Sequence, residues 1–327
     1  MLSGWKANGM NGCQEDSLPA NGGPFVRAFA CLIAVCSIQT VLLAQDKQPA
    51  APEFSITSNL VRLLVSVRDA SGAIVSSLDK ASFQVFDNGV EQTISAFERN
   101  TSLPLSLAIL VDTSASTRKD LSYESESILH FMRALKRAGN PEDSLAVYSF
   151  NWQIRLEVGF TRNEARAERS LRMLHGEGGT SLYDAVYLVS QDLADREGRH
   201  VLIVVTDGGD TTSYKQFGDA VRASLRAEAT IYPVVIVPIA GDAGRNTGGE
   251  HALDTMARST GGRTFNPSGA EELDQAFARI LSELRTQYLL AYHPRNTGSP
   301  QDKFHGVNVQ VRQPGCKVIT RSGYYEP

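Results

Sequence analysis

The chain has 327 residues, of which 42% are hydrophobic and 21% charged, and its formal net charge is −4. These proportions are those of a globular protein, and the length is sufficient for two ordinary domains. The acidic balance, which no basic stripe offsets, excludes the basic surface that attracts nucleic acid. We therefore expect a globular protein without a nucleic-acid partner.

The N-terminal segment resembles an export leader. Arg27 precedes an apolar run over 28–44 that is dominated by Ala, Leu, Ile, Val and Cys. The run is shorter than the ~20 residues of a confident spanning helix. We interpret 1–45 as a signal peptide or membrane anchor, with a buried helix as the alternative, and 46–53 as a linker. The protein is then exported: periplasmic, secreted or N-terminally membrane-anchored. Beyond this segment only Cys316 remains, so we expect no internal disulfide.

Both ends of the remaining chain have the patterns of β-strands. Apolar and polar residues alternate from Val61 to Arg68 and again from Val307 to Arg312, as in half-buried strands. Asn88-Gly89 between two strand-like runs is a strong hairpin signal. Residues 54–103 and 287–327 are each too few to bury a good core alone. We therefore predict that they form one small β-sandwich together, with the rest of the chain inserted between them.

The middle of the chain, residues 104–286, alternates apolar runs with helical patterns. The apolar runs are Leu107–Val111, Leu145–Phe150, Val201–Val205 and Ile231–Val237. The helical patterns are Tyr123–Arg137, Leu182–Arg196, Tyr214–Glu228, Leu253–Ser259 and Glu271–Leu284. The runs lack polar alternation, as expected for strands covered on both faces, and Ile154–Phe160 reads as an antiparallel edge strand. This order predicts an α/β fold with a doubly wound, mostly parallel sheet and helices on both faces.

Oxygen-bearing side chains lie where three of these elements end or begin. They are Asp112, Ser114, Ser116, Thr180 and Asp207. The carboxyl ends of parallel strands meet at one edge of a sheet, so we expect the three loops that carry these residues to converge. All five side chains are hard oxygen donors, which suit Mg²⁺ or Mn²⁺ better than zinc or copper. The sequence therefore predicts a site for one divalent metal ion.

Asp112-Thr113-Ser114-Ala115-Ser116, with Thr180 and Asp207, resembles the metal-ion-dependent adhesion site of von Willebrand factor A domains over about residues 104–286. The whole chain is similar to acidobacterial-type von Willebrand factor A-related proteins, in segments such as NLVRLLVSVRD and RSGYY. The resemblance implies that the serines and the threonine ligate the metal directly or nearly so, and the aspartates partly through water. It implies a non-catalytic, adhesion-like module in which a partner protein's Asp or Glu completes the coordination.

Other interpretations compete with this one. Ser and Asp are common at helix N-caps, so Asp112 or Ser116 could merely cap the helix that follows. Asp184 reads as a first-turn acid favoured by the helix dipole and Asp210 as a loop residue. The alternative function is a Mg²⁺-dependent phosphoryl-transfer enzyme with Asp112 as nucleophile. Haloacid-dehalogenase-type phosphatases require a second Asp two residues after the nucleophile, where this chain has Ser114. The oligomeric state and the partner's identity stay open.

Overall fold

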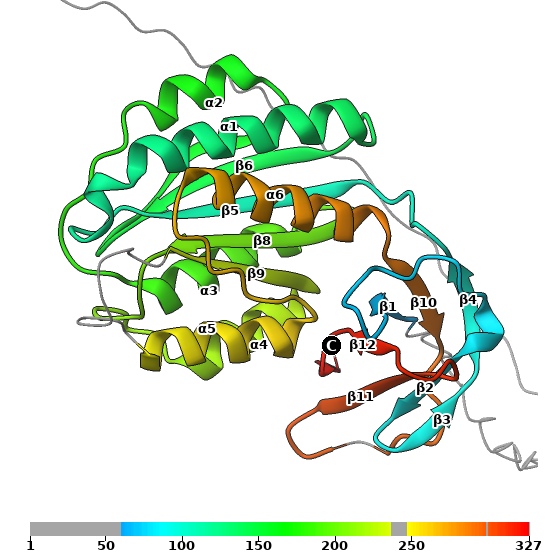
Figure 1. The fold of residues 1–327 in the computed structure, drawn as a ribbon. Helices are drawn as coiled ribbons and strands as arrows, with labels where there is room; N and C mark the ends of the chain where they lie inside the picture. Colours follow the sequence, from blue (N-terminus) through cyan, green and yellow to red (C-terminus); the bar gives the residue numbers. More distant parts are fainter. Residues whose placement is uncertain (1–59, 237–246, 299, 327) are drawn as a thin grey trace, which may run out of the picture. The chain divides into compact units, whose positions relative to one another are not determined.

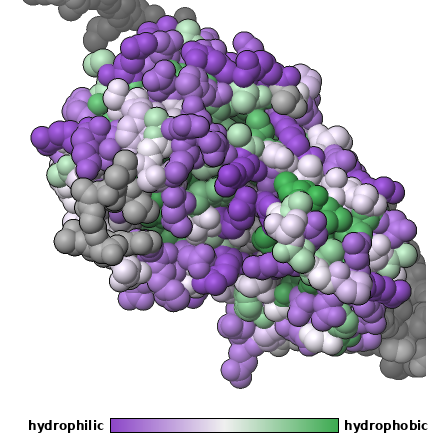
Figure 2. Space-filling model, in the orientation of Figure 1, coloured by the Kyte–Doolittle hydropathy of each residue, from purple (hydrophilic) through white to green (hydrophobic). Residues whose placement is uncertain are grey.

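The computed structural model describes residues 60–236, 247–298 and 300–326 (Figure 1). The leader and linker expected over 1–53 lie outside these residues, as does Val237, the end of one expected strand. Within the described ranges, no helix is both long enough and apolar enough to span a bilayer. On the face drawn in Figure 2, hydrophilic side chains dominate over the helices, and hydrophobic ones gather over the sandwich.

The α/β part is built on a five-stranded sheet with the order β7-β6-β5-β8-β9. Its strands are β5 (Leu105–Asp112), β6 (Ser144–Phe150), β7 (Ile154–Thr161), β8 (Arg199–Thr206) and β9 (Ala229–Val235). All are parallel except β7, which pairs antiparallel with β6 at the edge, as predicted. Every residue of β5, β8 and β9 is buried, which explains their uninterrupted apolar sequences.

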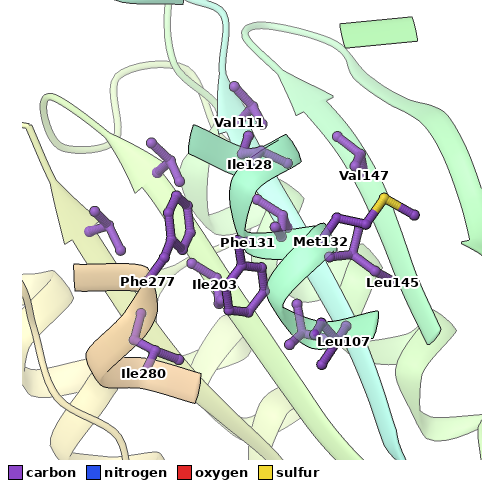
Figure 3. Packing of buried hydrophobic residues seen from close by; sticks show 14 of the residues in the cluster. Leu107, Val111, Ile128, Phe131, Met132, Leu145, Val147, Ile203, Phe277 and Ile280 are labelled. Atoms are coloured by element: carbon purple, nitrogen blue, oxygen red, sulfur yellow. The ribbon is translucent and has the colours of Figure 1, made fainter. Parts of the chain in front are cut away.

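Helices cover both faces of this sheet (Figure 1). One face carries α1 (Leu121–Ala138), α2 (Glu164–Leu171) and α6 (Ala270–Arg285), and the other carries α3 (Leu182–Ala194), α4 (Phe217–Arg226) and α5 (Thr247–Thr260). Figure 3 shows how α1 and α6 meet over the sheet: the rings of Phe131 and Phe277 lie 5.0 Å apart, above Leu107 and Ile203. Short 3-10 turns occur at η1 (Lys80–Ser82) and η2 (Thr117–Lys119). The helix α2 was not predicted, because only Ala167 and Leu171 of its eight residues are buried.

Two four-stranded antiparallel sheets form the sandwich, with the orders β12-β1-β10-β4 and β13-β11-β2-β3. The strands are β1 (Val61–Arg68), β2 (Phe83–Asp87), β3 (Val90–Gln92), β4 (Ile94–Glu98), β10 (Tyr288–Tyr292), β11 (Phe304–Val311), β12 (Lys317–Ile319) and β13 (Gly323–Tyr325). N- and C-terminal strands pair in both sheets, Leu63 with Leu290 and Val85 with Val309, and share one core. The predicted fold class, including the sandwich from both ends, is confirmed. The domain boundaries stay a prediction.

The chain passes between the sandwich and the α/β part through neighbouring strands, because β4 pairs antiparallel with β10. Arg199, which is 3% exposed, holds the two crossing segments together. Its Nε donates to the carbonyl oxygen of Leu103 at 3.1 Å, and its Nη1 donates to that of Leu284 at 2.5 Å. One guanidinium therefore fixes both connections at the end of the sheet where β8 begins.

A second junction forms around the fully buried carboxylate of Glu283 in α6. It accepts hydrogen bonds from Arg68 of β1 at 2.5 Å, from Arg263 at 2.9 Å and from the Tyr232 hydroxyl of β9 at 3.1 Å. Because Arg68 belongs to the sandwich and the other two residues to the α/β part, this carboxylate joins the two by charge-assisted hydrogen bonds.

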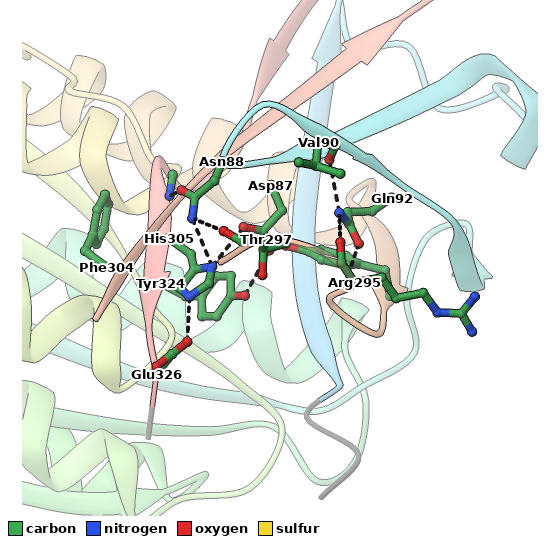
Figure 4. A network of polar contacts seen from close by, with 12 residues as sticks. Asp87, Asn88, Val90, Gln92, Arg295, Thr297, Phe304, His305, Tyr324 and Glu326 are labelled. Atoms are coloured by element: carbon green, nitrogen blue, oxygen red, sulfur yellow. Dashed lines mark hydrogen bonds and ion pairs between the residues drawn. The ribbon is translucent and has the colours of Figure 1, made fainter. Parts of the chain in front are cut away.

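A buried polar network connects the C-terminal strand β13 to the other strands of the sandwich (Figure 4). The Nδ1 of His305 lies 3.0 Å from Asp87 and its Nε2 lies 2.8 Å from Glu326. The hydroxyls of Tyr292 and Tyr324 donate to the other oxygen of Asp87, at 2.8 and 2.9 Å. Burial lowers the pKa of His305, but hydrogen bonds to the two carboxylates outweigh burial and raise it overall. His305 is therefore a structural histidine whose ring nitrogens both have partners.

Candidate metal centre

The candidate centre lies at the carboxyl ends of β5 and β8, where the winding of the sheet reverses. The chain continues from β5 to β6 and β7 on one side and places β8 and β9 on the other. Asp112 is the last residue of β5, and Asp207 directly follows Thr206, the last residue of β8. Parallel pairing of Val111 with Val205 puts these two strand ends side by side. Two carboxylates distant in sequence therefore share one edge of the sheet.

Four of the five predicted residues are linked by a chain of hydrogen bonds that runs through their side chains and one backbone N–H. The backbone N–H of Ser114 donates to Asp112 Oδ1 at 2.8 Å, and the Oγ atoms of Ser114 and Ser116 lie 3.1 Å apart. The hydroxyl of Ser116 donates to Asp207 Oδ1 at 3.1 Å. The loops after β5 and β8 therefore bring Asp112, Ser114, Ser116 and Asp207 together.

The loop that carries Thr180 lies against the loop after β5. The N–H of Ala115 donates to the carbonyl oxygen of Gly178 at 3.1 Å, and that of Glu177 donates to Thr113 at 2.8 Å. Gly178 has a φ of +75°, and a Cβ there would come within 2.3 Å of the Trp152 ring. Only glycine fits this close approach without strain. The loop path toward Thr180 therefore depends on Gly178.

Thr180 itself is held through its backbone. Its N–H donates to the Thr211 hydroxyl at 2.8 Å, and its carbonyl oxygen accepts from the Thr211 N–H at 2.8 Å. Among the described residues, its own hydroxyl makes no hydrogen bond to the other four donors. The side chain is 7% exposed. The structure thus places the Thr180 loop beside the other two loops and leaves the Thr180 hydroxyl without a direct link to them.

Two threonines that the sequence analysis missed orient the loop after β5. Thr206 donates from its hydroxyl to Asp112 Oδ2 at 2.6 Å. Thr117 donates to the carbonyl oxygens of Asp112, at 2.8 Å, and Ser114, at 3.1 Å. Neither follows from the sequence, because both contacts depend on how β5, β8 and η2 pack. Together they hold the Asp112 carboxylate and its loop in one conformation.

Asp184 and Asp210 connect the loop after β8 to the start of α3. The carboxylate of Asp184 accepts from the N–H groups of Tyr214 and Lys215 at 3.0 and 2.7 Å. That of Asp210 accepts from the N–H of Tyr183 at 3.3 Å. Asp184 does lie in the first turn of a helix, as expected, but it also anchors a neighbouring loop. Both aspartates therefore support the loops rather than contributing to the set of five.

Acidic side chains gather at the centre, and burial favours their protonated forms. Burial raises the pKa of Asp112 to about 6, although hydrogen bonds from Thr206 and Ser114 oppose the shift. Burial also raises the pKa of Asp207. Glu124, in the first turn of α1, is 1% exposed, and neither carboxylate oxygen has a hydrogen-bond partner. Its pKa is raised to about 9 by burial and by the charges of Asp112, Asp120 and Asp207.

The donor set fits a hard divalent cation. Across the residues that the structure describes, no group of three or more His, Cys, Asp or Glu side chains is arranged to hold a metal ion. The five predicted donors instead offer hydroxyl oxygens beside two carboxylates, a combination suited to Mg²⁺ or Mn²⁺. The enclosed Glu124 carboxyl adds a further group that a nearby cation would stabilise in its charged form. The five-residue ligand set remains a prediction.

Comparison with known proteins identifies part of the α/β region. Residues 107–209 match the family model of the von Willebrand factor type A domain. This segment contains all five predicted ligands, and the match supports the resemblance seen in the sequence. No curated protein matches the chain.

Several solved structures are similar to this chain at low sequence identity. A von Willebrand factor type A protein from Catenulispora acidiphila has 12% identity and a TM-score of 0.48, over 83% of this chain and 75% of that one. BatB from Bacteroides thetaiotaomicron has 16% identity and a TM-score of 0.44, over 55% and 98%. The PilB minor pilin from Streptococcus sanguinis has 10% identity and a TM-score of 0.45, over 57% of this chain and 62% of the pilin.

Proposed function

We propose that this chain is an exported, adhesion-like protein-binding module. In this proposal Asp112, Ser114, Ser116, Thr180 and Asp207 hold one Mg²⁺ or Mn²⁺, and an Asp or Glu of a partner protein completes the coordination. The observation that carries the proposal is the hydrogen-bonded chain from Asp112 to Asp207 at the switch point of the sheet. The match of residues 107–209 to the von Willebrand factor type A domain supports it.

The residues present would prepare the centre for an outside carboxylate. Thr206 and the Ser114 N–H hold Asp112 in place, and Ser116 holds Asp207. Two carboxylates balance the charge of a divalent ion, while the hydroxyl ligands add none. A divalent ion bound by this set supplies a Lewis-acidic position for one more oxygen. A partner carboxylate is the natural occupant, because it brings the negative charge that the ion attracts.

The geometry disfavours Asp112 as a phosphoryl-transfer nucleophile. Both of its carboxylate oxygens accept hydrogen bonds, one from Ser114 and one from Thr206. The residue is also fully buried. A nucleophile needs an oxygen free to reach the substrate. We therefore prefer the non-catalytic binding module to the phosphoryl-transfer enzyme.

Metal binding is tested by titrating the chain with Mg²⁺ or Mn²⁺ in a calorimeter. We expect one site in the wild type and an affinity about 100-fold weaker or worse in Asp112→Ala, because even outer-shell partners of metal ligands contribute 10–100-fold. Trp152 fluorescence offers a second readout, since its ring lies against Gly178 in the Thr180 loop. Asp195→Ala, an exposed site after α3, is the control and should bind as the wild type does. Equal affinity in Asp112→Ala would refute the assignment.

Variants of Thr180 distinguish partner binding through the metal from partner binding at another surface of the domain. Thr180→Ala should lose partner binding while Thr180→Ser keeps it, because only the hydroxyl is expected to ligate. The fold should survive, since Thr180 is held through backbone hydrogen bonds to Thr211. Surface plasmon resonance with a partner captured in Mg²⁺ provides the measurement, and binding should vanish in chelator and return with Mg²⁺. Binding that persists unchanged in chelator rules the mechanism out.

A further inference from the structure

A small cleft opens between the α/β part and the sandwich, at the opposite end of β8 from the candidate metal centre. We call it the inner cleft. Its volume is about 40 Å³, enough for an ion or a few waters. The polar residues that line it include Arg62, Arg199, His200, Glu228, Thr230 and Arg321. It therefore combines three guanidinium groups with a single carboxylate.

Two of these guanidinium groups have N–H donors without partners. Arg199 is 3% exposed, and its Nη2 makes no hydrogen bond, although its other donors reach carbonyl oxygens and Gln287. Arg321 is 8% exposed, and its Nε makes none. Its Nη2 donates to the carbonyl oxygen of Arg62 at 2.8 Å and to Glu228 at 3.3 Å. Unsatisfied buried donors of charged groups are costly, and their occurrence on two arginines that line one cleft points to a missing acceptor.

The charges around the inner cleft do not balance. Among the described residues Arg199 forms no ion pair, whereas Glu228 is shared by Arg62 at 3.2 Å and Arg321 at 3.3 Å. Burial and the nearby charge of Arg285 lower the pKa of Arg199 to about 10, although the charges of Asp143 and Glu98 oppose the shift, so Arg199 still carries its charge at neutral pH. A buried cation without a direct ion pair is unfavourable, and an anion in the cleft would stabilise it.

The approach to the inner cleft is also basic. A larger groove adjoins it, sharing Arg62, Glu228 and Arg321, and is further lined by Arg226, Arg295 and Lys303. The acids that line this groove are Glu228 and Glu326. Since the whole chain has a net charge of −4, this concentration of positive charge is local. It would raise the concentration of anions near the cleft.

We propose that the inner cleft binds one small monovalent inorganic anion of halide size, which accepts hydrogen bonds from Arg199 and Arg321. The anion would link β8 of the α/β part to the segment between β12 and β13 of the sandwich. Glu228, which lines the same cleft and whose carboxylate pairs with Arg62 and Arg321, would oppose the anion. This site is independent of the proposed metal centre.

The charge of Glu228 gives the sharpest test. Thermal unfolding is measured at increasing bromide concentrations, with gluconate making up the remaining salt so that the ionic strength stays constant. The bromide concentration at half of the maximal rise in unfolding temperature gives an apparent Kd. Glu228→Gln should tighten bromide binding by about threefold or more, because it removes the opposing charge. Glu271→Gln, an exposed acid at the start of α6, should leave the Kd unchanged. A purely structural role for Glu228 predicts no tighter binding.

Variants of the donors and a crystal structure complete the test. Arg199→Gln should abolish the bromide-dependent stabilisation, and Arg321→Lys, which keeps the charge but removes Nε, should weaken it if Arg199→Gln fails to fold. In crystals soaked in bromide, an anomalous difference peak should lie in the inner cleft beside Arg199 and Arg321. Water alone in the cleft, together with equal stability in bromide and gluconate, would overturn the proposal.

Discussion

Glu283→Gln is expected to lower the free energy of unfolding by about 3–5 kcal/mol, the usual cost of removing one partner from a buried ion pair. The carboxylate is fully buried and accepts from Arg68, Arg263 and Tyr232. A neutral amide has a single acceptor oxygen and one amino group that would face the guanidinium donors. Arg68 and Arg263 would then be left without a counter-charge. Urea denaturation followed by circular dichroism provides the measurement.

Glu168→Gln is the matched control for this change. Glu168 accepts from Arg172 one turn along α2, in an ion pair on the surface. Exposed pairs of this kind contribute little to stability, because solvent screens them. If Glu283→Gln lowered stability no more than this control does, Glu283 would not be the junction that the contacts indicate.

Glu124→Gln is expected to make the metal-free protein more stable at pH 7, by about 3 kcal/mol. The pKa of Glu124 is raised from its ordinary value of 4.5 to about 9, chiefly by burial. Between these two values the folded protein keeps a proton that the unfolded chain loses. Wild-type stability should therefore fall as the pH rises from about 5 to 9. Glutamine resembles the protonated acid, so it removes the ionisation that favours the unfolded chain.

The pH dependence is measured by urea denaturation in chelator, at several pH values across this window. The wild type should lose stability steadily, and Glu124→Gln should lose much less. Glu126→Gln is the control, because Glu126 lies on the same helix with an exposed side chain and should keep the wild-type slope. Parallel slopes for the wild type and Glu124→Gln would show that the Glu124 carboxyl is not enclosed as described.

The sheet and the position of the centre could be predicted because they depend on local sequence patterns. Buried strands such as β5 and β8 must be apolar along their whole length, so their ends mark where Asp112 and Asp207 lie. The alternation along β1 and β11 likewise reveals which faces are buried. Strands and helices in which each face is uniformly buried or uniformly exposed have a regular pattern of apolar and polar residues that can be recognised in the sequence.

The features of the candidate site that the sequence did not predict depend on contacts between segments that are distant along the chain. The sequence around Glu124 has the character of a solvated helix, and only packing shows that this carboxyl is enclosed beside Asp112. Thr206 reaches Asp112 across neighbouring strands, and Arg199 reaches both crossing segments. No spacing along the chain encodes such contacts. Thr180 is a further example. The sequence correctly predicts that its loop lies beside the other two loops, but it does not show whether its hydroxyl contacts the other four donors.

The pairing of β4 with β10 has a mechanical consequence. Tension applied between the two ends of the described chain acts first on the sandwich, where β1 and β13 lie in separate sheets. Along the backbone, the force enters the α/β part only after the pairing of β4 with β10, which includes Ala96 with Ala291 and Glu98 with Leu289, has opened. Until that ladder breaks, the backbone of the α/β part carries no load, and only side-chain contacts such as Arg68 with Glu283 couple it to the sandwich. A load along the chain would thus leave the loops around Asp112 unstretched.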